Sequence, residues 1–323
     1  LLLKQIPSNK IHFGKRILTV TEDKDDDKVH IQAADGTTYQ GDILVGADGA
    51  YSAVRQRLYE RLKAKSALPK ADQEELPFSC TCLVGQTEPL DVEQFPELKD
   101  PLAPYWVSLG EDKPYTNSEW GPFAAQSMCD ETRDFPIPIG TDKKTLGDLY
   151  DRTPKDLISK VMLEEKIFMT WFSGRTVLLG DACHKLHPAG GQGAMTAMHD
   201  AMALANLIYA LPSNSNKDIH QLFTDYQAER LPFVTEAFNS SRALAKGLEK
   251  GLGGMIALWI SRFIPQWLWK IFWTKVAKVR PQIGFLPQIP LKGTVVPIVT
   301  KSTEKARAVY ESRQGASSAA SAL

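Results

Sequence analysis

Residues 175–210 hold the groups best suited to chemistry in this sequence. Residues 176–179 have the length and β-branched content of a buried strand, and Asp181 follows the carboxyl end of that strand. Next comes a turn rich in residues that let the backbone approach a ligand closely: Pro188, Gly190, Gly191 and Gly193. Apolar residues then recur at helical spacing, so the free N–H groups of the first helical turn point back into the glycine loop. A strand, an acid, a glycine loop and a helix N-terminus together predict a site for an anionic ligand that carries hydroxyl groups.

A second acid follows a second short apolar strand. Residues 43–45 predict this strand, and a helix is expected over residues 51–63. Four residues of interest lie where the strand gives way to the helix: Asp48, Gly49, Ser52 and Arg55. Capping alone explains Asp48 and Ser52, because both residue types commonly cap helix N-termini. Ligand binding explains them too, and the two interpretations are compatible.

The first stretch resembles a known flavin motif. GDACHKLHPAGGQGA is similar to the second flavin motif of the group A flavoprotein monooxygenases, the para-hydroxybenzoate hydroxylase-like enzymes. The resemblance implies that Asp181 bonds the ribityl chain of FAD. It also implies that the rest of the cofactor faces the loop residues Gly180, Pro188, Gly190, Gly191, Gln192, Gly193 and Ala194. Met195 stands where the family usually has asparagine, which removes a polar contact near the flavin edge.

Two further segments extend this resemblance. GDILVGADGAYSAVR is similar to the middle motif of the same family, D-G-x-x-S-x-x-R, which implies that Asp48, Gly49, Ser52 and Arg55 contribute to FAD and reduced pyridine nucleotide binding. The two motifs occur in the family's order, about 130 residues apart. YQAERLP resembles the segment that follows the flavin helix, and we interpret Glu229 and Arg230 as candidates for structural ion pairs.

The resemblance implies an FAD-dependent monooxygenase. NADPH or NADH would reduce the flavin, O2 would add as a C4a-hydroperoxide, and one oxygen atom would pass to a small organic substrate. We name no catalytic side chain, because the cofactor performs the chemistry while the protein positions it and excludes water. Two alternatives stay open. One is a flavin-dependent reductase or dehydrogenase on the same fold, and the other is a non-catalytic, membrane-associated fragment that no longer holds FAD.

One expected element is missing from the sequence. The family opens with G-x-G-x-x-G, which holds the ADP pyrophosphate at a helix N-terminus, and no such string occurs here. The glycines at 251, 253 and 254 follow no predicted strand and indicate a helix break. The opening LLLKQIPSNK lacks the order of a signal peptide, and we interpret the chain as an N-terminally truncated fragment. We therefore expect it to bind FAD weakly or not at all.

The predicted fold class is α/β: a doubly wound, Rossmann-like FAD-binding domain without its first strand and glycine loop, an inserted sheet-containing substrate domain and a helical C-terminal tail. The boundaries predicted in the 323 residues are 1–75 and 173–248 for the FAD-binding domain, 76–172 for the substrate domain and 249–323 for the tail. A helix is expected over residues 153–168, with Thr153 as its cap and Pro154 at its first position. Residues around 116 suggest an internal omission from the substrate domain.

The segment 251–279 is apolar and holds four of the seven tryptophans. Its longest uncharged run falls short of the roughly 20 residues that a membrane-spanning helix needs. Tryptophans interspersed with lysines suit a helix that lies in a membrane interface. Packing against the rest of the protein or a second subunit explains the same pattern, and the sequence does not decide between them. The oligomeric state is left open.

Composition excludes some functions. The 38 basic and 38 acidic residues balance, so no electrostatic case exists for a nucleic-acid partner. The four cysteines lack zinc-like spacing and predict no disulfide framework, which favours a reducing, intracellular compartment, either cytoplasmic or at a membrane periphery. His184 and His187 have no evident third ligand, so we predict no metal site, and Cys183 is expected to be buried rather than nucleophilic.

Overall fold

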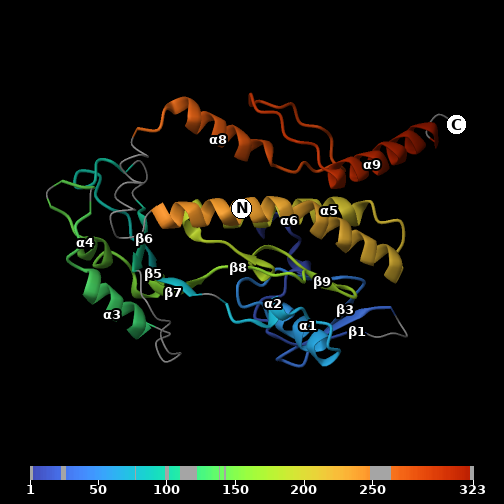
Figure 1. The fold of residues 1–323 in the computed structure, drawn as a ribbon, viewed down its shortest axis with the longest axis horizontal. Coiled ribbons are helices and arrows are strands. Elements are labelled where there is room, and N and C mark those ends of the chain that lie inside the picture. Colours follow the sequence, from blue (N-terminus) through green and yellow to red (C-terminus); the bar gives the residue numbers. More distant parts are fainter. Residues whose placement is uncertain are drawn as a thin grey trace. The chain divides into compact units, whose positions relative to one another are not determined.

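The computed structural model describes residues 3–22, 27–76, 78–98, 102–109, 122–137, 139–141, 143–247 and 263–320 (Figure 1). The chain divides into two compact units. Unit 1 comprises Leu1–Glu75 and Lys166–Leu323, and unit 2 comprises Leu76–Glu165. Unit 2 is thus an insertion in the sequence of unit 1, and each unit has its own hydrophobic core.

Unit 1 opens with two short 3-10 turns, Leu3–Gln5 and Ser8–Lys10, and a three-stranded antiparallel meander. The strands of the meander are β1 (Ile17–Glu22), β2 (Val29–Ala33) and β3 (Thr38–Gly41). The turn between β2 and β3 contains Asp35 and Gly36, and Gly36 has a φ of 83°, a value that favours glycine. Asp-Gly is a residue pair typical of such two-residue hairpin turns.

The second sheet of unit 1 brings together the two predicted strand–helix segments. β4 (Leu44–Gly46) pairs in parallel with β10 (Thr176–Leu178), and β9 (Phe172–Ser173) pairs antiparallel with β10. Helix α1 (Ala53–Ala64) follows β4, and helix α5 (Gly193–Tyr209) follows β10 after a loop. Because parallel strands in one sheet end at the same edge, both loops open on the same side.

The remaining elements of unit 1 are mainly helical. They are α2 (Lys70–Gln73), α6 (Asn216–Gly247), α8 (Gln266–Lys278) and α9 (Lys301–Ala320), together with the two-stranded pair β8 (Lys166–Ile167) and β11 (His184–Lys185). Figure 1 shows α6 and α5 side by side, with α8 and α9 beyond them. The core lies where β10, α5 and α6 meet, and it includes the fully buried Trp171, Leu204 and Phe223.

Unit 2 contains a separate antiparallel sheet of order β6-β5-β7. Its strands are β5 (Phe78–Gln86), β6 (Pro104–Leu109) and β7 (Ser159–Glu164), and its helices are α3 (Pro122–Thr132) and α4 (Leu146–Tyr150). A 3-10 turn, Lys155–Leu157, precedes β7. The core of unit 2 gathers Leu83, Phe95, Met128 and Tyr150.

The expected α/β class, the sheet within the insertion and the helical C-terminal region are confirmed. The helix expected over residues 153–168 is wrong, because this segment forms a 3-10 turn, β7 and β8. Thr153 does not cap a helix start; its hydroxyl donates to the carbonyl of Leu149 at the end of α4. Residues of β7 instead pair along the free edge of β5, which satisfies their backbone hydrogen bonds and overrides a weak local helix preference.

Two boundaries of the expected domains differ from the division into units. Residues 166–172, expected in the substrate domain, lie with unit 1, as does the tail. The roles given to the domains stay predictions. The expectations about residue 116 and the glycines at 251, 253 and 254 fall outside the described residues.

Candidate functional site

The ends of β4 and β10 bring the two predicted motifs together. Gly46 lies opposite Leu178 in the parallel register. Asp48 and Asp181 follow these strand ends, and both residues are exposed. Two carboxylates about 130 residues apart in sequence thus lie at the same sheet edge.

The motif that contains Asp48, Ser52 and Arg55 has the helix-capping geometry that the sequence suggested. Ser52 caps α1, since its Oγ accepts a 2.9 Å hydrogen bond from the backbone N–H of Arg55. Asp48 Oδ1 accepts from Ser52 Oγ at 2.5 Å, and Asp48 Oδ2 accepts from the N–H of Val54 at 3.1 Å. Both carboxylate oxygens therefore stabilise the start of α1, which confirms the structural interpretation of Asp48 and Ser52. Their contribution to a cofactor site stays a prediction.

Arg55 joins the two motifs. Its Nη1 donates to the carbonyl of Ala182 at 2.9 Å, and its Nη2 donates to the carbonyl of Ala50 at 2.7 Å. The guanidinium carbon lies 4.3 Å from the ring centroid of Phe168, and only 6% of the residue is exposed. This arginine positions the loop after β10 relative to α1.

The turn after β10 requires glycine and presents an acid. Gly180 has a φ of 59°, and a Cβ at this position would lie 2.9 Å from Cβ of Ala197 in α5. Within the described part of the chain, nothing donates a hydrogen bond to the carboxylate of Asp181. Asp181 is therefore an accessible acceptor for the hydroxyl groups of a ligand.

The glycine loop is held against α6. A Cβ on Gly190 would lie 2.2 Å from Ser241 Oγ, so only glycine fits this close approach. Pro188 opens the 3-10 turn that precedes Gly191, a residue with a φ of 61°. Gln192 donates from Nε2 to Ser240 Oγ at 3.2 Å, which also ties the loop to α6.

The start of α5 is open. Gln192 occupies the N-cap position without a side-chain cap, and Ala194 is exposed in the first turn. A Cβ added to Gly49, Gly191 or Gly193 would meet no heavy atom within 4 Å. The uncapped amides are suitable donors to an anion, and the carboxylate of Asp181 is a suitable acceptor, so these residues fit a cofactor with hydroxyls and negative charge such as FAD.

A buried polar network lies beneath this site, and the sequence revealed only part of it. Asp200 Oδ2 lies 2.5 Å from His184 Nε2 and 3.1 Å from the backbone N of Gly180, while Asp200 Oδ1 accepts from Arg230 Nε at 2.8 Å. All three side chains are at most 1% exposed. Burial alone would raise the pKa of Asp200, but the hydrogen bond with His184 and the charge of Arg230 lower it below its ordinary value. The sequence did not identify Asp200 as a residue of this network, because a single acid within a helix belongs to no recognisable motif.

The interpretation of Arg230 as a structural ion-pair residue is confirmed. Glu229 makes a different contact: its carboxylate accepts from the backbone N–H and the hydroxyl of Ser302, each at 2.7 Å, at the start of α9. This geometry caps α9 and joins it to α6.

Cys183, His184 and Asp200 place their polar atoms within 4.8 Å of one another. Burial raises the pKa of the Cys183 thiol well above its usual range, which keeps it protonated. Both oxygens of Asp200 already accept hydrogen bonds. These donors suit a structural network better than a metal ion, which requires deprotonated and available ligands.

Comparison with known proteins gives a consistent family. The family described as "FAD binding domain" matches residues 3–241. FAD-dependent monooxygenase ptmM of Penicillium ochrochloron is 30% identical over 74% of this chain and 61% of its own length. FAD-dependent monooxygenase atmM of Aspergillus flavus is 28% identical over 87% of this chain and 63% of its own. The chain thus spans less than two thirds of these relatives.

Solved structures show the same fold at lower identity. HpxO of Klebsiella pneumoniae, complexed with FAD and uric acid, is 19% identical with a TM-score of 0.57, over 81% of this chain and 65% of that one. A salicylate hydroxylase substrate complex is 21% identical with a TM-score of 0.51, over 83% of this chain and 71% of that one.

Proposed function

Because the chain belongs to the FAD binding domain family, we propose that it forms the flavin site of an FAD-dependent monooxygenase. Such an enzyme uses NADPH or NADH and O2 to insert one oxygen atom into a small organic substrate. The observation that supports this most is the pairing of β4 with β10, which brings Asp48, Asp181 and the uncapped start of α5 to one edge.

Each part of the site has a role in this proposal. Asp181 accepts hydrogen bonds from ligand hydroxyls, and the amides around Gly191 to Ala194 donate to negative charge, which the α5 dipole also stabilises. Asp48 and Ser52 fix the start of α1, and Arg55 holds the loop after β10 in place against it. FAD, when bound, would supply the redox chemistry, and the protein residues bind and orient it.

An FAD titration followed by flavin fluorescence tests this function. We expect weak but saturable binding by the 323-residue chain, since the sequence has no G-x-G-x-x-G loop for the pyrophosphate. Asp181→Ala should weaken binding by about tenfold, the effect of losing a charge-assisted hydrogen bond of about 1.4 kcal/mol. Asp156→Ala removes an exposed carboxylate from unit 2 and serves as the control.

Because binding by this chain is expected to be weak or absent without a G-x-G-x-x-G loop, a lack of saturable binding would contradict the flavin site if a longer chain that includes this loop also fails to bind FAD. Equal binding by the wild type and Asp181→Ala would remove Asp181 from it. Oxygen transfer is tested separately, by incorporation of label from ¹⁸O₂ into product; consumption of NADPH with no labelled product would favour a reductase or dehydrogenase.

A second proposal concerns α8, which we infer to contact an anionic lipid surface. Among the described residues, no helix has the length and apolar content to cross a bilayer. Trp267, Ile271 and Trp273 are 62%, 58% and 59% exposed on this helix. Lys270 and Lys278 on the same helix complement anionic headgroups, as in interfacial amphipathic helices.

Co-sedimentation with vesicles tests the lipid contact. Trp267→Glu with Ile271→Glu should reduce binding to phosphatidylserine-containing vesicles at least about fivefold, because two apolar side chains lose their favourable transfer. Val92→Glu changes an equally exposed residue of unit 2 and should bind normally. Sedimentation that is unchanged by the double substitution would exclude α8 as the contact.

A further inference from the structure

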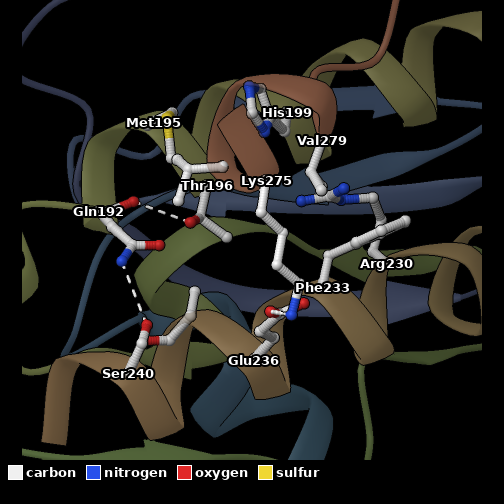
Figure 2. Close-up of a pocket in the computed structure, with 12 residues that line it drawn as sticks. Gln192, Met195, Thr196, His199, Arg230, Phe233, Glu236, Ser240, Lys275 and Val279 are labelled. Carbon is white, nitrogen blue, oxygen red and sulfur yellow. Dashed lines mark hydrogen bonds and ion pairs between the residues drawn. The ribbon is translucent and has the colours of Figure 1, made fainter. Parts of the chain in front are cut away.

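A cavity of about 260 Å³ lies between α5, α6 and α8 in unit 1 (Figure 2). Its apolar wall consists of Met195, Phe233, Ala237, Val276 and Val279. Most of its polar groups gather on two helices, with His199 on α5 and Arg230 on α6. An apolar pocket with a few convergent polar groups is the usual form of a small-molecule site.

Arg230 brings an unused donor to this cavity. The residue is 1% exposed, and its Nε is occupied by Asp200. Its Nη1 is buried and has no hydrogen-bond partner among the described residues. Buried donors are almost always satisfied, so this N–H indicates that the cavity receives an acceptor. The guanidinium carbon also lies 5.6 Å from the ring centroid of Phe233, beside the apolar wall.

The charges around the cavity limit which acceptor fits. Asp200 balances Arg230 on one side, and Glu236 forms an ion pair with Lys275 of α8 on another. Burial and the charge of Arg230 lower the pKa of His199 to about 4, so its imidazole is neutral at pH 7 and offers one N–H. Two carboxylates close by would repel a dianion such as phosphate. A single negative charge can use the charge-assisted N–H of Arg230, which favours a carboxylate.

We propose that this cavity binds a small organic monocarboxylate, with its carboxylate at Arg230 and its apolar body against α6 and α8. The cavity adjoins the loop site through Gln192 and Met195, at the start of α5. Asp48 and Asp181 do not line it. Binding here therefore does not depend on the flavin proposal.

Isothermal titration with benzoate tests the site on the 323-residue chain. Val276→Trp fills the cavity from α8 while Asp200 and Arg230 keep their own side chains, and it should weaken benzoate binding at least about tenfold. Leu268→Trp introduces the same side chain at an exposed position of the same helix, away from the cavity, and should change binding less than about twofold. Benzamide, a neutral analogue of the same shape, should bind at least about tenfold more weakly than benzoate.

Three results would overturn the proposal. Equal affinity for benzamide and benzoate would exclude recognition of a carboxylate, and equal affinity of Val276→Trp and wild type would exclude this cavity. Loss of benzoate binding at saturating FAD would assign the ligand to the flavin site. Circular dichroism melts confirm that each variant is folded. If Val276→Trp does not fold, Ala237→Phe fills the same cavity from α6 and replaces it in the test.

Discussion

Asp200 contacts three separate parts of unit 1 through one carboxylate. It accepts hydrogen bonds from the backbone of Gly180 and from Arg230 of α6, and pairs with His184 of β11. Removing one partner of such a buried pair typically costs about 3–5 kcal/mol, because the other charge is left unpaired. Asp200 therefore positions the site at the strand ends from below, although its own side chain is buried and does not line the site.

Stability should depend on pH through His199. Its folded pKa is about 4, whereas an unfolded histidine titrates near 6.5, so the unfolded chain binds the extra proton between these values. The free energy of unfolding should then fall on acidification from about pH 6.5 to about pH 4, by on the order of 1–3 kcal/mol. The groups that face His199 are Arg230, Asp200, Glu236 and Lys275.

Urea unfolding at pH 4.5, 5.5 and 6.5 measures this dependence. His199→Gln should flatten it, whereas His220→Gln, at an exposed position of α6, should leave it unchanged. The same slope in wild type and His199→Gln would show that other groups carry the acid sensitivity.

The local placement of several residues could be predicted from the sequence, while their part in a cofactor site stays a prediction. The strand ends and helix starts that position the site lie next in sequence to its residues, which are Asp48, Ser52, Asp181 and the glycine loop. The partners of Asp200 lie 16, 20 and 30 residues away in sequence, and nothing in that sequence sets the register of α5 against α6. Such pairs are defined only by tertiary packing.

At the scale of elements, Asn206 connects α5 to the C-terminal segment. Its Nδ2 donates to the carbonyl of Gln282 at 2.7 Å, and its Oδ1 accepts from the N–H of Gly284 at 2.8 Å. Asn206 is fully buried, and Gly284 lies so close to α9 that a Cβ would be 2.5 Å from the carbonyl oxygen of Thr303. The segment that leads into α9 is therefore fixed by hydrogen bonds rather than by apolar packing alone.

Asn206→Leu should loosen this connection. The substitution leaves the N–H of Gly284 unpaired, at a cost of about 1–3 kcal/mol. It also removes one of two donors to the carbonyl of Gln282, which still accepts from the hydroxyl of Thr303 at 2.8 Å. Hydrogen exchange should accelerate in residues 282–310 and stay unchanged in α1. Ser312→Ala, in an exposed part of α9, is the control. Uniform acceleration throughout unit 1 would instead indicate that Asn206 supports the whole core.

Secondary-structure elements were predicted correctly where the apolar pattern was strong. They were predicted wrongly where pairing with a distant strand determines the structure. The strands before both acids and the helix expected over residues 51–63, which is observed as α1, follow from local pattern. The segment of β7 carries the marks of a helix start, yet the free edge of β5 makes it a strand. No local signal reports the presence of such an edge.

On the scale of the whole molecule, the two units have separate hydrophobic cores. Leu83 is fully buried in the core of unit 2, and Leu204 is 2% exposed in the core of unit 1. Each unit thus contains the main source of its own stability.

Leu83→Ala should destabilise unit 2 without affecting unit 1. The cavity should cost about 2–5 kcal/mol and should accelerate hydrogen exchange in β5 and α3 but not in α5 or α6. Leu204→Ala should produce the reverse pattern. Accelerated exchange across both units in either variant would show that they unfold as one.

The pairing of β4 with β10 also has a consequence for synthesis on the ribosome. Among the described residues, β10 is the only partner of β4, and about 130 residues separate them, including all of unit 2. At roughly 5–20 residues per second, β10 is made about 7–25 s after β4. The nascent chain must carry an unpaired strand and its exposed carboxylate for that time, and the insertion, with its own core, is complete before the sheet edge that holds Asp48 and Asp181 can form.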